Sequence, residues 1–149
     1  MNKIYALVIV LFASFTLHAQ HPVTWTFTAT KKADKLYEVH MTATMQPGWH
    51  LYSQTQPADA VAMPTDFTIN SNALITLDGK VKEVGKMEKF HDAKLDLSAN
   101  QYASKVDFVQ LVKLKGNVKT NFSGAVEYQT CNDNRCLPPK TVNFNIALQ

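Results

Sequence analysis

The stretch WTFTATKKADKLYEVHMTATM, residues 25–45, alternates apolar and polar side chains along two runs that a polar turn separates. In the first run the apolar side chains alternate with threonines, and in the second every other residue from Tyr37 to Met45 is apolar. A period of two is typical of strands that bury one face and expose the other. The stretch therefore predicts two antiparallel strands joined at the turn 31–34, a β-hairpin.

The same alternation continues along the rest of the chain, and no helical periodicity is visible in it. It predicts further short strands at residues 67–69, 74–77, 81–84, 95–97, 106–114, 118–122, 125–128 and 142–148. Asp78-Gly79 is a strong signal for a tight turn between the second and third of these strands. About eight or nine short strands separated by turns predict an all-β fold, an antiparallel β-sandwich of immunoglobulin-like architecture.

Two stretches, 47–64 and 85–94, lack clear alternation and are expected to be irregular. Loops of this length in a compact sandwich are often functional. No internal repeat, low-complexity tract or linker divides the sequence, so residues 20–149 are expected to form a single domain.

Residues 1–19 have the composition of a secretory signal peptide. Lys3 supplies the positive start, Ile4 to Leu17 is the apolar stretch, and Ala19 offers a small residue at the cleavage point. Because a spanning helix needs about 20 apolar residues, we expect the protein not to span a membrane after the signal is removed. Export delivers the chain to an oxidising compartment, where disulfides persist.

Charge and motifs exclude several classes of function. The chain carries 15 basic and 12 acidic residues, a net charge of +3, with no basic cluster beyond Lys31-Lys32 and the alternating Lys113 and Lys115. A nucleic-acid partner is therefore not expected. The sequence also has no phosphate-cradling glycine run and no nucleophile elbow, so nucleotide and hydrolase functions have no support.

Cys131 and Cys136 are the only cysteines, and both lie in the segment YQTCNDNRCLPP, residues 128–139. A disulfide that closes so short a loop stabilises the fold by only about 2 kcal/mol in the chain-entropy estimate. Stability alone is thus a poor reason for the pair. Arg135, the only arginine of the chain, would favour a thiolate, whereas Asp133 would oppose it. From these residues alone, a structural staple and a redox pair are equally open.

Three segments together resemble the N-terminal periplasmic domain of the thiol:disulfide interchange protein DsbD. They are PGWHLYS at 47–53, EKFH at 88–91 and the cysteine segment 128–139, and the resemblance extends over essentially all of residues 20–149. It implies a periplasmic immunoglobulin-like domain that receives reducing equivalents from a membrane-embedded donor. The domain would pass them to thioredoxin-fold proteins through a redox-active cysteine pair, and no cofactor is expected.

The resemblance also implies roles for individual residues. The matching positions are the exchanging pair Cys131 and Cys136, the cap-loop segment with Glu88, Phe90 and His91, and the site-lining His50 and Tyr52. Cys136 is implied to bond to partners, and Phe90 is implied to shield the sulfurs. Arg135 joins the expected site through its position beside Cys136. His50 and Tyr52 lie two residues apart, so they share one face of any extended segment.

The chain departs from the best-known enterobacterial member of this family in two respects. That protein has one more residue between its cysteines, and it is fused to a transmembrane domain and a thioredoxin domain that are not expected in this chain. The first difference is a tolerable loop variation. The second difference leaves the identity of the electron donor open, and a separate membrane-embedded protein is one expectation. The sequence does not predict the oligomeric state.

Two alternatives stand beside thiol–disulfide interchange. The cysteines, three histidines and two methionines form a soft-ligand inventory that suits copper, namely Cys131, Cys136, His40, His50, His91, Met41 and Met45. Their spacing matches no metal motif, and the methionines fit the apolar face of their strand, so no metal site is expected. The second alternative is a non-catalytic interaction domain with a structural disulfide, because a fold alone does not define a function.

Overall fold

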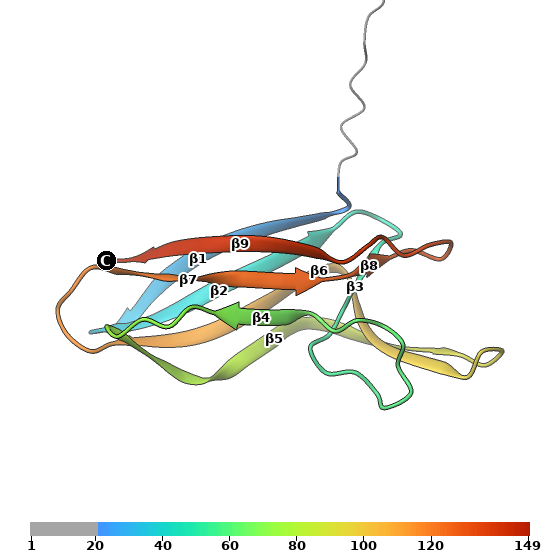
Figure 1. The fold of residues 1–149 in the computed structure, drawn as a ribbon, viewed down its shortest axis with the longest axis horizontal. Coiled ribbons are helices and arrows are strands. Elements are labelled where there is room, and N and C mark those ends of the chain that lie inside the picture. Colours follow the sequence, from blue (N-terminus) through green and yellow to red (C-terminus); the bar gives the residue numbers. More distant parts are fainter. Residues whose placement is uncertain (1–20) are drawn as a thin grey trace, which may run out of the picture.

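The computed structural model describes residues 21–149, so the predicted signal peptide at 1–19 lies outside the described residues (Figure 1). Within this range, no helix that could cross a membrane is found. The strands here are β1 (Val23–Ala33), β2 (Leu36–Met45), β3 (His50–Tyr52), β4 (Asp66–Ile69), β5 (Ile75–Asp92), β6 (Leu97–Leu114), β7 (Thr120–Tyr128), β8 (Thr130–Cys131) and β9 (Lys140–Leu148).

The strands form two sheets that pack as the layers of a sandwich (Figure 1). One sheet has six strands in the order β1-β2-β6-β3-β8, with β5 also paired to β6, and the other has the order β4-β7-β9. The strand pairs are antiparallel throughout. The predicted all-β, immunoglobulin-like antiparallel sandwich is confirmed, and so is the first hairpin, in which Trp25 lies opposite Ala43.

Aromatic rings from both sheets fill the space between the layers. The ring of Trp25 lies 5.7 Å from that of Phe108 in its own sheet and 6.1 Å from that of Phe67 in the other. Met41 and Met45 are buried on the inner face of β2, as the alternation predicts. Burying a large apolar side chain contributes about 1.5–3 kcal/mol, so this layer of rings and methionines holds the two sheets together.

The predicted tight turn at Asp78-Gly79 is wrong, because β5 runs through both residues as one strand. Gly79 does adopt a positive φ of 74°, but it belongs to an irregularity in the pairing of β5 with β6. The side-chain amide of the buried Gln110 donates to the carbonyl oxygens of Asp78 and Gly79 at 3.3 and 3.2 Å. The Asp-Gly pair therefore marks a β-bulge, which needs the same backbone freedom as a turn.

The expectation that residues 85–94 are irregular is also wrong. The segment 85–92 is the second half of β5, and it pairs with β6 as far as Asp92 opposite Leu97. Leu95 lies in the connecting turn rather than in a strand, so the predicted short strand at 95–97 is instead the beginning of β6. The result is a long hairpin that extends beyond the rest of the sandwich at one end (Figure 1).

The strand β6 changes its second partner at Ser104, which has a φ of 75°. The C-terminal part of β6, from Lys105 onward, pairs with β2. The part before Ser104, ending at Ala103, pairs with the short strand β3. Since β5 has a register shift between Gly85 and Met87, both strands of the hairpin are irregular at this level. The distal half of the hairpin, together with β3 and β8, thus forms a distinct end of the sheet.

The predicted strands 118–122 and 125–128 are one strand, β7, which passes through Gly124. A Cβ atom at Gly124 would lie 2.2 Å from the carbonyl oxygen of Thr68 and 2.9 Å from the ring of Phe144. The glycine is therefore required for the close approach of β4 and does not interrupt the strand. The predicted irregular stretch 47–64 contains only the three-residue strand β3 before β4 begins at Asp66.

Candidate functional site

Four strands bring the predicted site residues to one face of the six-stranded sheet. His50 on β3 lies directly opposite Cys131 on β8, and Tyr52 follows His50 by two positions. Tyr52 pairs across to β6, and the next strand, β5, contributes Glu88 and Phe90 in the same register. Directly opposite residues in antiparallel strands share a face, as do alternate residues along one strand. These five side chains therefore lie on the same surface.

Two small cavities open on this surface beside the sulfurs. One, of about 200 Å³, is lined by His50, Tyr52, Phe90, Gln101, Cys131, Asn132, Asp133 and Cys136. The other, of about 180 Å³ and mainly apolar, is lined by Tyr52, Val61, Ala62, Phe90, Leu97, Ser98, Ala99, Gln129 and Cys136. Tyr52, Phe90 and Cys136 line both cavities. The phenylalanine thus lies between the two hollows that give access to the disulfide.

Cys131 and Cys136 form a disulfide, and their environments differ sharply. Cys131 is 2% exposed and packs with Tyr52 and Ala99, whereas Cys136 is exposed. The loop between them is a tight turn in which the side-chain oxygen of Asn132 accepts the backbone N–H groups of residues 134 and 135. A nucleophile from solvent therefore reaches Cys136 before it reaches Cys131.

The histidine and tyrosine beside the disulfide interact with each other. Nε2 of His50 lies 3.3 Å from the hydroxyl of Tyr52, with the two rings edge to face. Burial lowers the pKa of His50, while the nearby carboxylates of Asp133 and Glu88 act in the opposite direction. Burial also raises the pKa of Tyr52. At neutral pH the cavity therefore contains an uncharged imidazole and a protonated phenol.

Arg135 is directed toward the loop that precedes β3. Its guanidinium lies 5.9 Å from the ring centre of Trp49, within the range of a cation–π interaction. Trp49 is half-buried and packs against the main core. The charged residue that lines the cavity with the two cysteines is Asp133. The predicted effect of Arg135 on a thiolate stays a prediction.

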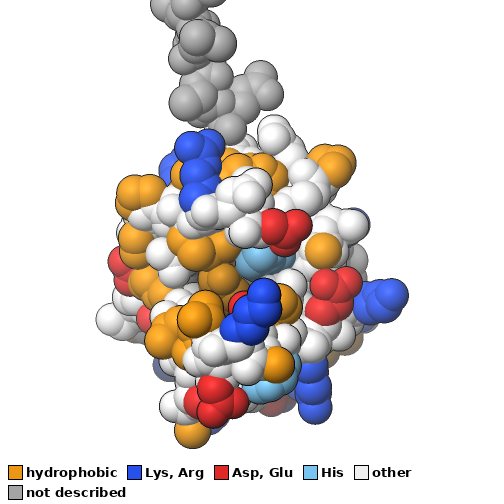
Figure 2. All heavy atoms as spheres, turned by 90° about the vertical axis from the view of Figure 1, so that its right-hand side faces the viewer, with side chains coloured by type: hydrophobic (Ala, Val, Ile, Leu, Met, Phe, Trp, Pro, Cys, Tyr) orange, Lys and Arg blue, Asp and Glu red, His pale blue; other side chains and the backbone are white. Residues whose placement is uncertain are grey.

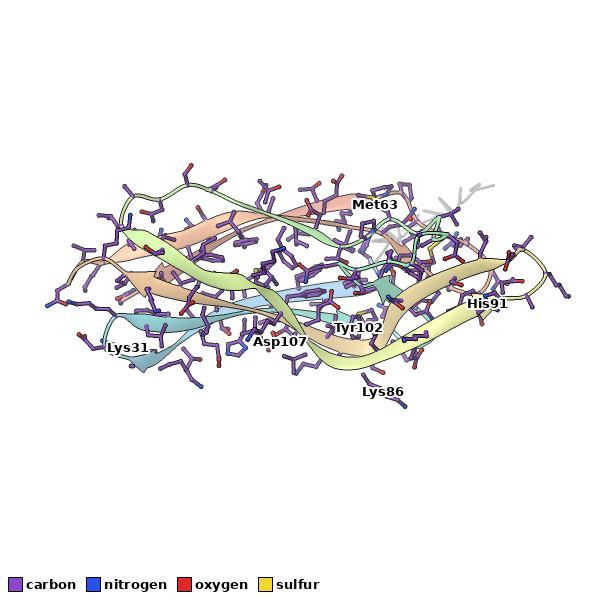
Figure 3. The ribbon with its side chains drawn as sticks, turned by 90° about the horizontal axis from the view of Figure 1, so that it is seen from below. Lys31, Met63, Lys86, His91, Tyr102 and Asp107 are labelled. Carbon is purple, nitrogen blue, oxygen red and sulfur yellow. A yellow bond between two sulfur atoms is a disulfide. The ribbon has the colours of Figure 1, made fainter. Side chains whose placement is uncertain are left out.

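His91 is not brought to the sulfurs with the other predicted residues. It follows Phe90 on β5, so its side chain lies on the opposite face of the hairpin, where Nδ1 is 3.1 Å from the hydroxyl of Ser98. Figure 3 shows it near the tip of the hairpin, at the end of the molecule opposite Lys31. The segment expected as a cap loop is thus a paired strand, and Glu88 and Phe90 alone face the disulfide.

Several residues that line the cavities were not predicted from the sequence. Gln101 and Ala99 lie on β6, which extends nine residues further toward the N-terminus than its predicted start at residue 106. Ala99 and Gln101 are odd-numbered, whereas the buried positions of β6 from Val106 to Leu114 are even-numbered, so the alternation of that strand gave no signal for them. Val61 and Ala62 belong to the irregular segment before β4, where no periodic signal exists.

Of the residues of the copper alternative, only His50, Cys131 and Cys136 line one cavity, and the other four lie elsewhere. Among residues 21–149, no group of three or more histidine, cysteine, aspartate or glutamate side chains is placed to hold a metal ion. On the outer face of β2, His40 Nδ1 lies 2.7 Å from a carboxylate oxygen of Asp107. Met41 and Met45 lie in the core on the other face.

The end of the molecule that carries the disulfide presents hydrophobic side chains together with histidine and mixed charges (Figure 2). The protein is therefore a two-layer antiparallel β-sandwich domain with a disulfide at this end, in which one cysteine is buried and the other is exposed. Residues 16–148 match the family model of the thiol:disulfide interchange protein DsbD, N-terminal. The chain belongs to this family.

Solved structures with the same fold include domains from Neisseria meningitidis and Proteus mirabilis. The reduced N-terminal domain of DsbD from Neisseria meningitidis has a TM-score of 0.51 and 15% identity, over 83% of this chain and 84% of that one. The same domain in a complex with the N-terminal domain of PilB has a TM-score of 0.53 and 15% identity, over 89% of this chain and 88% of that one. The N-terminal periplasmic domain of ScsB from Proteus mirabilis gives 0.51 and 18%, over 89% of this chain.

This chain covers 48% of the ScsB structure, about half its length. At identities of 15–18%, these likenesses show the fold alone. The comparison with curated proteins gave no match.

Proposed function

We propose that this protein carries out thiol–disulfide interchange through Cys131 and Cys136, passing reducing equivalents to or from thioredoxin-fold partners in the periplasm. The observation that carries the proposal is the unequal exposure of the two bonded cysteines at a shared cavity. Membership of the DsbD N-terminal family supports the reaction, and the ScsB relative is described as a periplasmic domain. A separate membrane-embedded protein is the proposed electron donor.

The oxidised domain is reduced by attack at the exposed sulfur. A donor thiolate attacks Cys136 Sγ, the bond between the two cysteines breaks, and Cys131 leaves as a thiolate that takes up a proton. A second donor thiol then attacks the mixed disulfide and releases Cys136. The donor becomes a disulfide, and the domain gains two electrons and two protons.

The reduced domain transfers its electrons by the reverse sequence. The Cys136 thiolate attacks a disulfide of the partner, forming a mixed disulfide and releasing one partner thiol. Cys131, held beside it by the short loop, then attacks Cys136 Sγ at high effective concentration and releases the second partner thiol. In this scheme Cys136 is the sulfur that bonds to partners and Cys131 is the resolving sulfur.

The test is to trap the mixed disulfide. Replacing Cys131 by Ala removes the resolving sulfur, so Cys136 should accumulate disulfide-linked complexes with thioredoxin-fold proteins in periplasmic extracts. These complexes are identified by mass spectrometry after non-reducing electrophoresis. The matched variant Cys136→Ala should trap much less, because its remaining thiol is buried.

Equal trapping by the two variants would contradict the assignment of Cys136 as the partner-bonding sulfur. No trapping by either variant would favour the interaction domain with a structural disulfide. In the related complex from Neisseria meningitidis, a DsbD N-terminal domain is bound to another protein domain, which supports the expectation that this domain has a protein partner.

A further inference from the structure

The exchange reaction described above uses the two cysteines and gives no role to the titratable side chain of His50. His50 lies directly opposite Cys131 on the neighbouring strand, and the two side chains line the same cavity. Directly opposite residues in an antiparallel pair have Cβ atoms about 4.5–5.5 Å apart, which places an imidazole nitrogen within reach of a thiol on that face. The resolving step requires the buried Cys131 as a thiolate, and a buried thiol loses its proton reluctantly.

We infer that His50 accepts the proton of the Cys131 thiol in the resolving step, an inference that rests on the proposed exchange reaction. Tyr52 orients the ring, since its hydroxyl lies 3.3 Å from Nε2. With Nε2–H donating to the tyrosine oxygen, Nδ1 is the nitrogen that takes up the proton. Burial favours the neutral imidazole that this role needs.

The charged groups around the ring support the transfer. Asp133 from the cysteine loop and Glu88 from β5 both raise the pKa of His50, opposing the effect of burial. They stabilise the imidazolium once it has formed. The one guanidinium of the cysteine loop, that of Arg135, is directed to Trp49. The ring is therefore neutral before the transfer and is stabilised as a cation after it.

The step balances in atoms and electrons. In the mixed disulfide, the proton of Cys131 Sγ moves to His50, and the thiolate attacks Cys136 Sγ. The bond between Cys131 and Cys136 forms as the bond from Cys136 to the partner breaks. The partner leaves as a thiolate and takes a proton from the His50 imidazolium or from water. His50 returns to its neutral state, and the partner sulfurs have gained two electrons.

The test separates the two sulfurs by kinetics. Reduced protein is mixed with one equivalent of dithiobis(nitrobenzoate), and thionitrobenzoate release is followed by absorbance. The first phase reports attack by Cys136 and the second reports resolution by Cys131. In His50→Gln the second phase should slow by about tenfold or more near neutral pH, because a positioned base contributes at least that much. The first phase should not change, and imidazole in the buffer should restore part of the second.

The pH profile gives the signature of a proton acceptor. The acid limb of the second phase should lie below pH 6.5 in the wild type, because burial lowers the pKa of His50 from that ordinary value. In His50→Gln it should move to about pH 8.5 or above, where a cysteine thiol ordinarily titrates. His40→Gln, on the outer face of β2 beside Asp107, is the matched control and should leave both phases unchanged. An unaltered acid limb in His50→Gln would overturn the inference.

A second measurement keeps His50 in place, in case His50→Gln does not fold. The titration of the His50 ring is followed by NMR in Cys136→Ala and in the double variant that also lacks Cys131. A thiolate that forms beside the ring changes its environment, so the His50 ring signals should show a second inflection at the pH where the Cys131 thiol titrates, and the double variant should lack it. Absence of a second inflection in Cys136→Ala would contradict the inference. Failure to trap any partner, with both kinetic phases intact, would instead remove the proposed function.

Discussion

At the scale of single residues, burial makes two chemically identical cysteines different. Cys131 is enclosed by Tyr52 and Ala99, whereas Cys136, five positions later, is exposed at the mouth of two cavities. Access limits the chemistry of a thiol, so the exposed sulfur is the one that an incoming partner meets. The proposed division of labour between attack by Cys136 and resolution by Cys131 rests on this difference in exposure.

Phe90 is the residue that we propose controls that access. Its side chain is 49% exposed, yet it lines both cavities beside Cys136. We predict that Phe90→Ala lowers the free energy of unfolding by only about 1 kcal/mol, since half of the ring is already in water. The reduced pair should react faster with a small alkylating reagent, because the ring no longer covers the sulfurs.

Phe108→Ala is the matched control for this prediction. Its ring is completely buried in the core, so the same truncation should cost about 3–5 kcal/mol. Urea unfolding measures both costs, and timed alkylation of the folded protein measures access. A large loss of stability in Phe90→Ala, without faster alkylation, would show that Phe90 is a packing residue and that the sulfurs are covered by something else.

At the scale of elements, a polar cluster holds the segment after β3 against the long hairpin. The carboxylate of Glu83 on β5 accepts hydrogen bonds from the Ser53 hydroxyl at 2.7 Å, the Gln54 backbone N–H at 2.6 Å and the Tyr102 hydroxyl at 2.7 Å. A backbone bond from Ser53 to Asn100 adds a link to β6. Because Tyr52 immediately precedes this segment, the cluster fixes the strand that lines the disulfide.

The cluster makes stability depend on alkaline pH. Burial, with the hydrogen bond to Glu83, raises the pKa of Tyr102. A raised folded-state pKa contributes stability that is complete below the ordinary tyrosine pKa of about 10 and is lost as the pH rises above it. We predict that Tyr102→Phe lowers the free energy of unfolding by about 1.5–3 kcal/mol at neutral pH, since a charge-assisted hydrogen bond is lost.

The difference between wild type and Tyr102→Phe should shrink as the pH rises above about 10, because only the wild type then loses this contribution. Urea unfolding at a series of pH values measures it. A difference that stays constant across the alkaline range would show that the Tyr102 hydroxyl is not coupled to Glu83 in the folded state.

The elements also show where the sequence is informative. The first hairpin is predictable because β2 buries one face, so its alternation is complete. The distal half of β5 is not, because it is an edge strand whose side chains are mostly exposed, Met87 and Phe90 included. Glycine and aspartate signals were ambiguous for a related reason. Asp78-Gly79 lies at a β-bulge, and Gly124 allows the close approach of a neighbouring strand. The sequence alone does not distinguish either of these from a turn.

In the candidate site too, some features could be predicted from local sequence and others could not. His50 and Tyr52 share a face through simple parity, and their meeting with Cys131 depends on a strand pairing that is not local in the sequence. The motif resemblance supplied that connection for the cysteines and Phe90. Residues such as Gln101 were missed because β6 continues past its predicted beginning.

At the scale of the whole molecule, the site and the core are separate. The aromatic core lies between the sheets, while the disulfide and its lining form a second, smaller buried cluster at one end. The disulfide joins residues only five positions apart. A loop this short removes little entropy from the unfolded chain, so the sandwich does not depend on the bond for most of its stability. We therefore expect the fold to persist when the bond is reduced.

The reduction potential of the Cys131–Cys136 disulfide tests this view most directly. The purified protein is equilibrated in glutathione and dithiothreitol buffers, and the fraction of reduced protein is measured by thiol alkylation. We predict a potential above about −300 mV, in the range of labile and catalytic disulfides, with the fold retained in the reduced state. A potential well below that value, or unfolding on reduction, would identify the bond as a structural staple and contradict thiol–disulfide interchange.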